Sequence, residues 1–223
     1  GGCAPIAVDA NGDFSVDVSS NLVDRAATRF SAYVIPLRGQ FPCAQPADTI
    51  PDIVEQLSLN AGAKTTAPRL PGYRVISFSG LDWYVKTAPQ KVFPGPQFFS
   101  DSPTNIFMDS SGRLHLRISK CQQEWCSAEL FTTANVGYGK YEVRVVSPLN
   151  NLDPNVTFGV FTWDEQATSE DHREWDIEFS RWGRPFDQNN AQYVVQPYTR
   201  PGNISRFNIA SDQSTTNSVD WAP

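Results

Sequence analysis

HREWDIEFSRWG, the stretch from His172 to Gly183, decides the fold of this chain. Its three acidic residues, Glu174, Asp176 and Glu178, stand at alternate positions, with tryptophan, isoleucine and phenylalanine between and after them. Successive side chains of a β-strand point to opposite faces, so the acidic residues share one face and the apolar residues share the other. A helix would spread the carboxylates around about two-thirds of its circumference and would leave no apolar stripe. The stretch therefore predicts a strand that covers a core with one face and presents an acidic row on the other.

Short strand-like segments, separated by turn residues, fill the chain from Tyr73 onward. They run over Arg74–Phe78, Leu81–Lys86, Asn105–Met108, Leu114–Ile118, Trp125–Phe131, Lys140–Val146, Val156–Thr162, Glu174–Phe179, Gln192–Gln196 and Arg206–Ile209. Helical patterns are few, and strands do not alternate with helices. This organisation predicts an all-β fold in which antiparallel strands form a β-sandwich or jelly roll.

The part of the chain before Tyr73 is less regular. Strand-like segments at Phe14–Val18 and Arg29–Ile35 are expected to be either the tail of a β-sandwich accessory module or strands that pack on the main domain, because two strands cannot bury a core alone. A short helix is expected from Pro51 to Leu59, with the proline in its first turn. The predicted domain boundaries are residues 1–64 for the N-terminal segment, 65–72 for a linker and 73–223 for the main domain.

Composition and charge limit the class of protein. The 223 residues are 40% hydrophobic and 12% aromatic, as in globular proteins. No run of about 18 apolar residues occurs, so no membrane-spanning segment is expected. The net charge of -6 and the lack of a basic patch argue against a nucleic-acid partner and favour a neutral or cationic one. The chain opens with two glycines rather than with Met or an apolar leader, which is typical of a mature or shortened chain.

The cysteines are Cys3, Cys43, Cys121 and Cys126. Cys121 and Cys126 are spaced for a disulfide across a hairpin, where Cα atoms can approach to about 5.5 Å. A second disulfide between Cys3 and Cys43, free thiols and a zinc site are the further alternatives. Zinc is disfavoured because no C-x₂-C spacing occurs and only two histidines are present. A disulfide would favour an extracellular, secreted protein.

The acidic row suits the hydrolysis of glycosidic bonds with retention of configuration. That reaction needs two carboxyl groups about 5–5.5 Å apart, one to attack the anomeric carbon and one to protonate the leaving oxygen. The Cα atoms of Glu174 and Glu178 would lie about 13 Å apart on a straight strand, and both side chains can lean inward to approach that distance. Asp176 lies between them, so like charges raise the pKa values of the row and one carboxyl group should hold its proton near neutral pH. A protonated carboxyl group is what a general acid requires.

Two other interpretations of the row remain open on spacing alone. One is an ordinary surface strand with charged residues outside and apolar residues inside. The other is a calcium site made of carboxylates. Against the surface strand stands the cost of like charges at close range, since Arg173 and Arg181 only flank the row.

The segment Glu174–Phe179, with the sequence EWDIEF, resembles the E-x-D-x-E signature of glycoside hydrolase family 16. That family is a β-jelly-roll group that includes lichenases, laminarinases and related endo-β-glucanases. Ser127–Leu130, Tyr138–Val145 and Phe158–Trp163 are similar to further motifs of the family in order and spacing. The resemblance covers roughly Tyr73–Pro223 and implies a concanavalin-like jelly roll.

The same resemblance implies a role for each acidic residue. Glu174 would be the nucleophile, Glu178 the general acid/base and Asp176 the carboxylate that assists between them. The sequence departs from the family at Trp175, where a mid-sized aliphatic residue is usual. Since this side chain points away from the carboxylates, we expect a change in the core rather than a loss of activity. A second departure concerns Ser218–Pro223, which resembles a segment that leads into further strands, so the jelly roll is expected to be truncated at its C-terminus.

Seven further residues are candidates for substrate binding: Trp163, Glu142, Arg144, Trp182, Gln192, Gln196 and Tyr198. The aromatic ones offer faces on which sugar rings stack, with core or loop packing as the alternative. Glu142 and Arg144 alternate on one strand, and the family resemblance favours the cleft for both over a salt-bridged solvent face. The two glutamines share a face of their strand, where they would bond sugar hydroxyls or lie exposed. His172 is expected to be a loop residue rather than a catalytic base.

These features predict a secreted glycoside hydrolase that cleaves internal β-glycosidic bonds of a polysaccharide with retention. A non-catalytic carbohydrate-binding jelly roll is the first alternative, although both glutamates needed for catalysis are present. A transglycosylase of the same family is the second, because acceptor choice depends on the shape of the cleft. The expected partner is a polysaccharide, bound by a monomer. No nucleotide-binding motif occurs and no cofactor is expected; a structural calcium ion is left open without any feature that indicates it.

Overall fold

The computed structural model describes residues 28–36, 56–61, 69–121, 124–167, 171–210 and 214–222. Within these ranges the chain forms a 3₁₀ turn, η2 (Leu149–Asn151), and the strands β1 (Thr28–Pro36), β2 (Gln56–Ala61), β3 (Arg74–Phe78), β4 (Leu81–Val85), β5 (Ala88–Val92), β6 (Gln97–Phe99), β7 (Ile106–Met108), β8 (Leu114–Leu116), β9 (Ser119–Cys121), β10 (Glu124–Thr132), β11 (Gly139–Val145), β12 (Val156–Asp164), β13 (Trp175–Phe179), β14 (Ala191–Val195), β15 (Ile204–Phe207) and β16 (Thr215–Trp221). The predicted all-β fold is confirmed. The strand predicted at Phe14–Val18 and the pair Cys3 and Cys43 lie outside the described residues.

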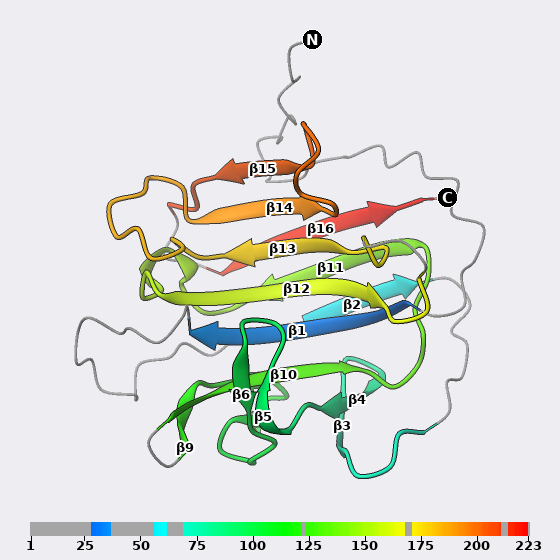
Figure 1. Ribbon diagram of the computed structural model, residues 1–223. Helices are drawn as coiled ribbons and strands as arrows, with labels where there is room; N and C mark the ends of the chain where they lie inside the picture. The colour runs from blue at the N-terminus through cyan, green and yellow to red at the C-terminus, as the bar shows by residue number, and fades with distance from the viewer. Residues whose placement is uncertain are drawn as a thin grey trace.

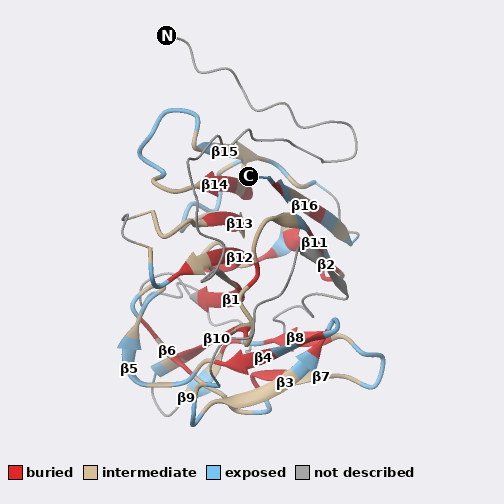
Figure 2. Cartoon of the chain, turned by 90° about the vertical axis from the view of Figure 1, so that its right-hand side faces the viewer, coloured by how far each residue is buried: buried red, intermediate tan, exposed pale blue. Residues whose placement is uncertain are grey.

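One large, mainly antiparallel sheet contains most of these strands. Its order is β15-β14-β13-β12-β1-β10-β4-β3, which Figure 1 shows from top to bottom, with β6 and β9 attached to β10 and β5 attached to β6. A second sheet, β16-β11-β2, forms the other layer and lies beside β12, β13 and β14 in Figure 2. β7 and β8 pair only with each other among the described strands. The chain is thus an antiparallel β-sandwich of the jelly-roll type.

The core lies between the two layers. Tyr141 on β11 packs against Phe30 on β1 and Trp175 on β13, with ring centroids 5.4 and 5.0 Å apart. Trp175, Ile177 and Phe179 are all buried in this core, which confirms the apolar face predicted for their strand. The other face of β13 therefore points away from the core.

β1 lies in the middle of the large sheet. It pairs with β12 on one side and with β10 on the other. Both of its faces are covered, since Phe30 and Val34 join the main core while Tyr33 and Ile35 join a smaller apolar cluster on the opposite face. Residues 28–36 are therefore built into the same sheet as the strands after Tyr73 and do not form the tail of a separate module.

The helix predicted from Pro51 to Leu59 is wrong where the chain is described. Residues 56–61 form β2, which pairs antiparallel with β11 from Gln56 opposite Arg144 to Ala61 opposite Gly139. Backbone pairing with a neighbouring strand outweighs the weak local preference for a helix. Residues 51–55, and residues 65–68 of the predicted linker, lie outside the described ranges.

The predicted disulfide between Cys121 and Cys126 is confirmed. It joins β9 to β10, which pair antiparallel, and the two Cα atoms are 5.7 Å apart. The bridge therefore cross-links these two strands of the large sheet.

Candidate active site

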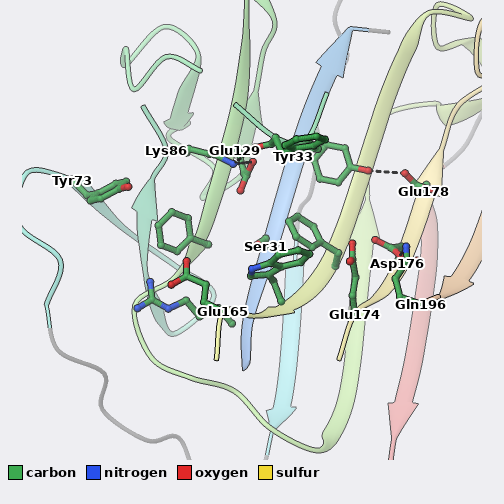
Figure 3. A pocket seen from close by; sticks show the side chains of 16 residues that line it. Ser31, Tyr33, Tyr73, Lys86, Glu129, Glu165, Glu174, Asp176, Glu178 and Gln196 are labelled. Carbon is green, nitrogen blue, oxygen red and sulfur yellow. Dashed lines mark hydrogen bonds and ion pairs between the residues drawn. The ribbon is translucent and has the colours of Figure 1, made fainter. Parts of the chain in front are cut away.

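A cleft of about 530 Å³ lies on the face of the large sheet that points away from the core. It crosses β13, β12, β1 and β10, and each of these strands contributes side chains to its lining. Phe131, Phe161 and Trp163 supply apolar surface. Figure 3 shows acidic side chains gathered at the β13 end and the pair Lys86 and Glu129 farther along the cleft. The cleft therefore combines aromatic surface with a concentration of carboxyl groups.

Glu174, Asp176 and Glu178 all line the cleft, so the acidic row predicted from the sequence exists. Asp176 and Glu178 belong to β13, and Glu174 directly precedes that strand. Asp176 is buried, with 6% of its surface exposed, whereas the two glutamates are half-buried. The row is therefore not the fully solvated face of an ordinary surface strand.

The neighbouring strand β14 fixes the row from one side. Gln192 lies opposite Glu178 in the strand register and donates a hydrogen bond to its Oε2 at 2.5 Å. Gln196 contacts Asp176 Oδ2 at 3.4 Å, and its backbone N–H donates to the carbonyl of Glu174 at 3.0 Å. Both glutamines predicted as site residues thus bond the acidic row, directly or through the backbone.

A tight turn before β13 positions Glu174. His172 and Arg173 both have left-handed backbone conformations, with φ of 47° and 51°, which cost energy in residues other than glycine. Arg173 is held there by an ion pair with Asp164, a residue with no exposed surface, and its carbonyl accepts a hydrogen bond from Thr162 Oγ1 at 3.0 Å. The buried ion pair therefore stabilises an unfavourable turn next to the site.

Burial controls the protonation of the row. It raises the pKa of Glu174 to about 7, and the charge of Glu178 contributes in the same direction. Burial also raises the pKa of Asp176 well above its usual range, and the charges of Glu174 and Glu178 add to this effect. A hydrogen bond joins the Glu174 and Asp176 side chains; it lowers the pKa of Glu174 and raises that of Asp176. These directions favour the protonated form at Asp176 over Glu174.

An ion pair lies on the far side of the cleft. Lys86 Nζ is 2.7 Å from Glu129 Oε2 and also donates to the carbonyl of Phe93 at 2.6 Å. Burial raises the pKa of Glu129, and Lys86 partly opposes this effect. The lysine thereby connects the sheet to the loop between β5 and β6.

Five of the seven predicted substrate-binding residues do not line the cleft, although one of them, Gln192, bonds Glu178. Glu142 and Arg144 alternate on β11 with Tyr141, Val143 and Val145, which are buried in the core, so they point to the outer side of the second sheet. Trp182 is covered by the guanidinium of Arg206, 4.4 Å from its ring centroid, and Tyr198 is exposed beyond Gln196. The expectation that Glu142 and Arg144 reach the cleft is wrong, because β11 belongs to the opposite layer.

Trp163 does line the cleft, where its ring stacks on His172 with centroids 3.9 Å apart. Sequence reasoning missed Tyr33, Lys86 and Glu129. Glu129 lies within the motif Ser127–Leu130, which was a usable signal. No sequence signal identified Tyr33, because the pattern of its own strand does not show that this strand lies near the acidic row.

The described part of the chain contains no group of three or more His, Cys, Asp and Glu side chains arranged to hold a metal ion. No helix within the described ranges is long and apolar enough to cross a membrane. Comparison of the chain with family models, with curated proteins and with solved structures finds no match.

Proposed function

We propose that the protein is a retaining glycoside hydrolase that cleaves internal β-glycosidic bonds of a polysaccharide. One observation carries this proposal: Glu174, Asp176 and Glu178 line one cleft, and burial raises the pKa of both Glu174 and Asp176. Retaining cleavage requires an ionised carboxylate to attack and a second carboxyl group to give and take a proton. The similarity of EWDIEF to the family 16 signature supports the same assignment of roles.

In the first step Glu174 attacks the sugar. Its carboxylate oxygen bonds to the anomeric carbon as the bond from that carbon to the leaving oxygen breaks. Glu178 gives its proton to the leaving oxygen, so the departing sugar is a neutral alcohol. Asp176 keeps its own proton and holds the attacking carboxylate in place through their hydrogen bond.

In the second step water completes the cycle. Glu178, now ionised, takes a proton from a water molecule whose oxygen bonds to the anomeric carbon. The bond between that carbon and Glu174 breaks, and the carboxylate is restored. Each step inverts the anomeric carbon, so the product keeps the starting configuration.

The cleft composition supports a polysaccharide as the substrate. From β13 to β10 the cleft crosses three strand spacings, roughly 14 Å, which is longer than one sugar ring. Phe131, Phe161 and Trp163 offer apolar surface for sugar rings among polar side chains that can bond hydroxyl groups. Acidic side chains outnumber basic ones in the lining, and Lys86 is already paired with Glu129, which favours a neutral glycan over a polyanion.

A non-catalytic binding module is less well supported, because burying interacting carboxyl groups costs stability and gives no evident advantage in binding neutral sugars.

Export from the cell is supported by the Cys121–Cys126 disulfide, since such bonds persist in oxidising compartments.

An assay on polymers tests the function. The wild-type protein is incubated with laminarin, mixed-linkage β-glucan, agarose, carrageenan and xyloglucan, beside Glu174→Ala, Glu178→Ala and the control Glu142→Ala. We expect reducing ends to be released from at least one polymer, with losses of about 10²- to 10⁴-fold in the first two variants and less than about twofold in the control. Release that survives Glu174→Ala would contradict the nucleophile, and no release by the wild type from any polymer would contradict the enzyme.

A further inference from the structure

Tyr33 crosses one strand of the sheet to reach the acidic row. In the register Tyr33 on β1 lies opposite Gly159 on β12, and Gly159 in turn lies opposite Glu178 on β13. The Tyr33 hydroxyl donates a hydrogen bond to Glu178 Oε1 at 2.7 Å, shown as a dashed line in Figure 3. The ring therefore spans the position at which β12 would otherwise present a side chain.

Gly159 makes this path possible. A Cβ atom at residue 159 would lie 2.7 Å from both the Cζ and the hydroxyl oxygen of Tyr33, closer than such atoms approach in proteins. Glycine is needed at this position for the space that its missing side chain leaves, and not for backbone freedom, since Gly159 does not adopt a left-handed conformation. Any other residue at position 159 would push the Tyr33 ring away from Glu178.

The Tyr33 ring is held firmly. Only 5% of the residue is exposed, and it packs in a cluster with Ile35, Phe99 and Phe161, the last at 5.5 Å and edge-on. Burial, assisted by the nearby Glu178 and Asp176, raises the pKa of Tyr33 well above its usual value. The hydroxyl therefore keeps its proton and remains a donor throughout the neutral pH range.

We propose that Tyr33 is a positioning residue for Glu178, and that Gly159 provides the space through which it acts; this inference rests on the proposed function. The terminal torsion of a glutamate is broad, so an unrestrained carboxyl group turns freely. Tyr33 bonds one oxygen of Glu178 and Gln192 bonds the other, which fixes the plane of the group. Each oxygen retains another lone pair, on which the transferred proton can reside. An acid/base group needs such fixed geometry, within about 0.5 Å, to reach the leaving oxygen.

The test compares Tyr33→Phe with Tyr193→Phe. Tyr193 is an equally buried tyrosine whose hydroxyl donates to Asn217 Oδ1 at 3.1 Å in the core, so this variant controls for the loss of a buried hydrogen bond. Two substrates are used: the polymer cleaved by the wild type, and a dinitrophenyl glycoside of the same sugar, whose leaving group departs without a proton. For Tyr33→Phe we expect kcat/KM on the polymer to fall about 10- to 100-fold, and that on the dinitrophenyl glycoside to fall less than about threefold.

A series of leaving groups adds a readout that a structural role would not move. For Tyr33→Phe, kcat/KM should fall more steeply than for the wild type as the leaving group becomes more basic, because a misplaced Glu178 assists its departure less. Tyr193→Phe should change neither this dependence nor the ratio of kcat/KM for the two substrates. Equal losses on both substrates, or behaviour matching Tyr193→Phe, would overturn the positioning role.

Gly159→Ala provides a second variant in which the hydroxyl is kept but displaced. It should show the same selective loss on the polymer, and the double variant with Tyr33→Phe should lose much less than the product of the two single losses, because both remove one contact. A double variant whose loss of kcat/KM equals the product of the two single losses would contradict the inference.

A ¹³C NMR spectrum of the Glu178 carboxyl group at one fixed pH separates this inference from the proposed function without substrate. A carboxyl chemical shift that differs between Tyr33→Phe and the wild type supports the contact, and an unchanged chemical shift contradicts it. An inactive wild type whose carboxyl resonance still responds to Tyr33→Phe would instead locate the failure in the proposed function.

Discussion

Asp176 lies between two other carboxyl groups, and with 6% of its surface exposed it has little water to solvate a negative charge. Burial and the neighbouring carboxylates raise the pKa of Asp176 well above its usual range, which favours its protonated form. The stability of the protein should therefore depend on whether this group is ionised, and so on pH.

The free energy of unfolding should depend on the ionisation of Glu174 and Asp176. In the folded state the pKa of Glu174 is raised from 4.5 to about 7, and the pKa of Asp176 is also raised, chiefly through burial. The folded state thus binds more protons than the unfolded state in this window, so the free energy of unfolding falls as pH rises from about 4.5 to 7. In Asp176→Asn the side chain keeps its shape and a donor but has no charge. We expect the variant to match the wild type near pH 4 and to exceed it by about 1–3 kcal/mol at pH 8 in urea unfolding.

Asp187→Asn is the matched control with the opposite sign. The pKa of Asp187 is lowered, first by the backbone N–H of Asn189 and also by Arg206. Its ionised form therefore stabilises the folded state, and the variant should be less stable than the wild type at pH 8 relative to pH 4. A pH-independent difference for Asp176→Asn would contradict the buried proton.

At the scale of the element, alternation made β13 predictable. Trp175, Ile177 and Phe179 could be assigned to the core, and the acidic residues to the opposite face, because a strand has a strict period of two. Each of the ten segments expected after Tyr73 overlaps a strand of the structure for the same reason. The sequence did not predict β5, β6, β9 and β16. β6 and β9 contain only three residues each, β16 is largely polar, and β5 contains a proline.

Strand neighbours were not predictable in this way. The pattern of β1 shows two faces but not that β10 and β12 flank it, and the pattern of β11 does not say which layer it joins. Tyr33 and Glu178 are separated by 145 positions in the chain, so only the sheet order brings them together. This is why the acidic row was found from the sequence and its tyrosine partner was not, and why Glu142 and Arg144 were assigned to the wrong side.

The central place of β1 leads to a prediction about stability. Phe30 has no exposed surface and packs against Trp83, Tyr141 and Trp175, which belong to three other strands. Phe30→Ala should therefore lower the free energy of unfolding by about 3–5 kcal/mol. The control Phe186→Ala removes a ring that is 92% exposed and should change it by less than about 0.5 kcal/mol. Similar values for both variants would mean that β1 lies outside the core.

At the scale of the whole molecule, the sandwich divides its large sheet between two tasks. One face closes the core against β16, β11 and β2, and the opposite face carries the cleft. The hairpin of β5 and β6 packs on the cleft face through Phe99, and Lys86 bonds both its loop and Glu129. A rigid sheet thus supports every group assigned to the reaction, which suits a mechanism that depends on fixed distances.

Trapping the covalent intermediate tests whether Glu174 is the nucleophile. A 2-deoxy-2-fluoro dinitrophenyl glycoside of the sugar found in the polymer assay should react quickly and hydrolyse slowly, because fluorine slows both steps while the good leaving group restores the first. Mass spectrometry of the intact protein should then show one added glycosyl unit per chain, located on Glu174 after digestion and absent from Glu174→Gln. A wild-type protein that hydrolyses the polymer but forms no adduct, or carries the adduct on Glu178, would contradict the account.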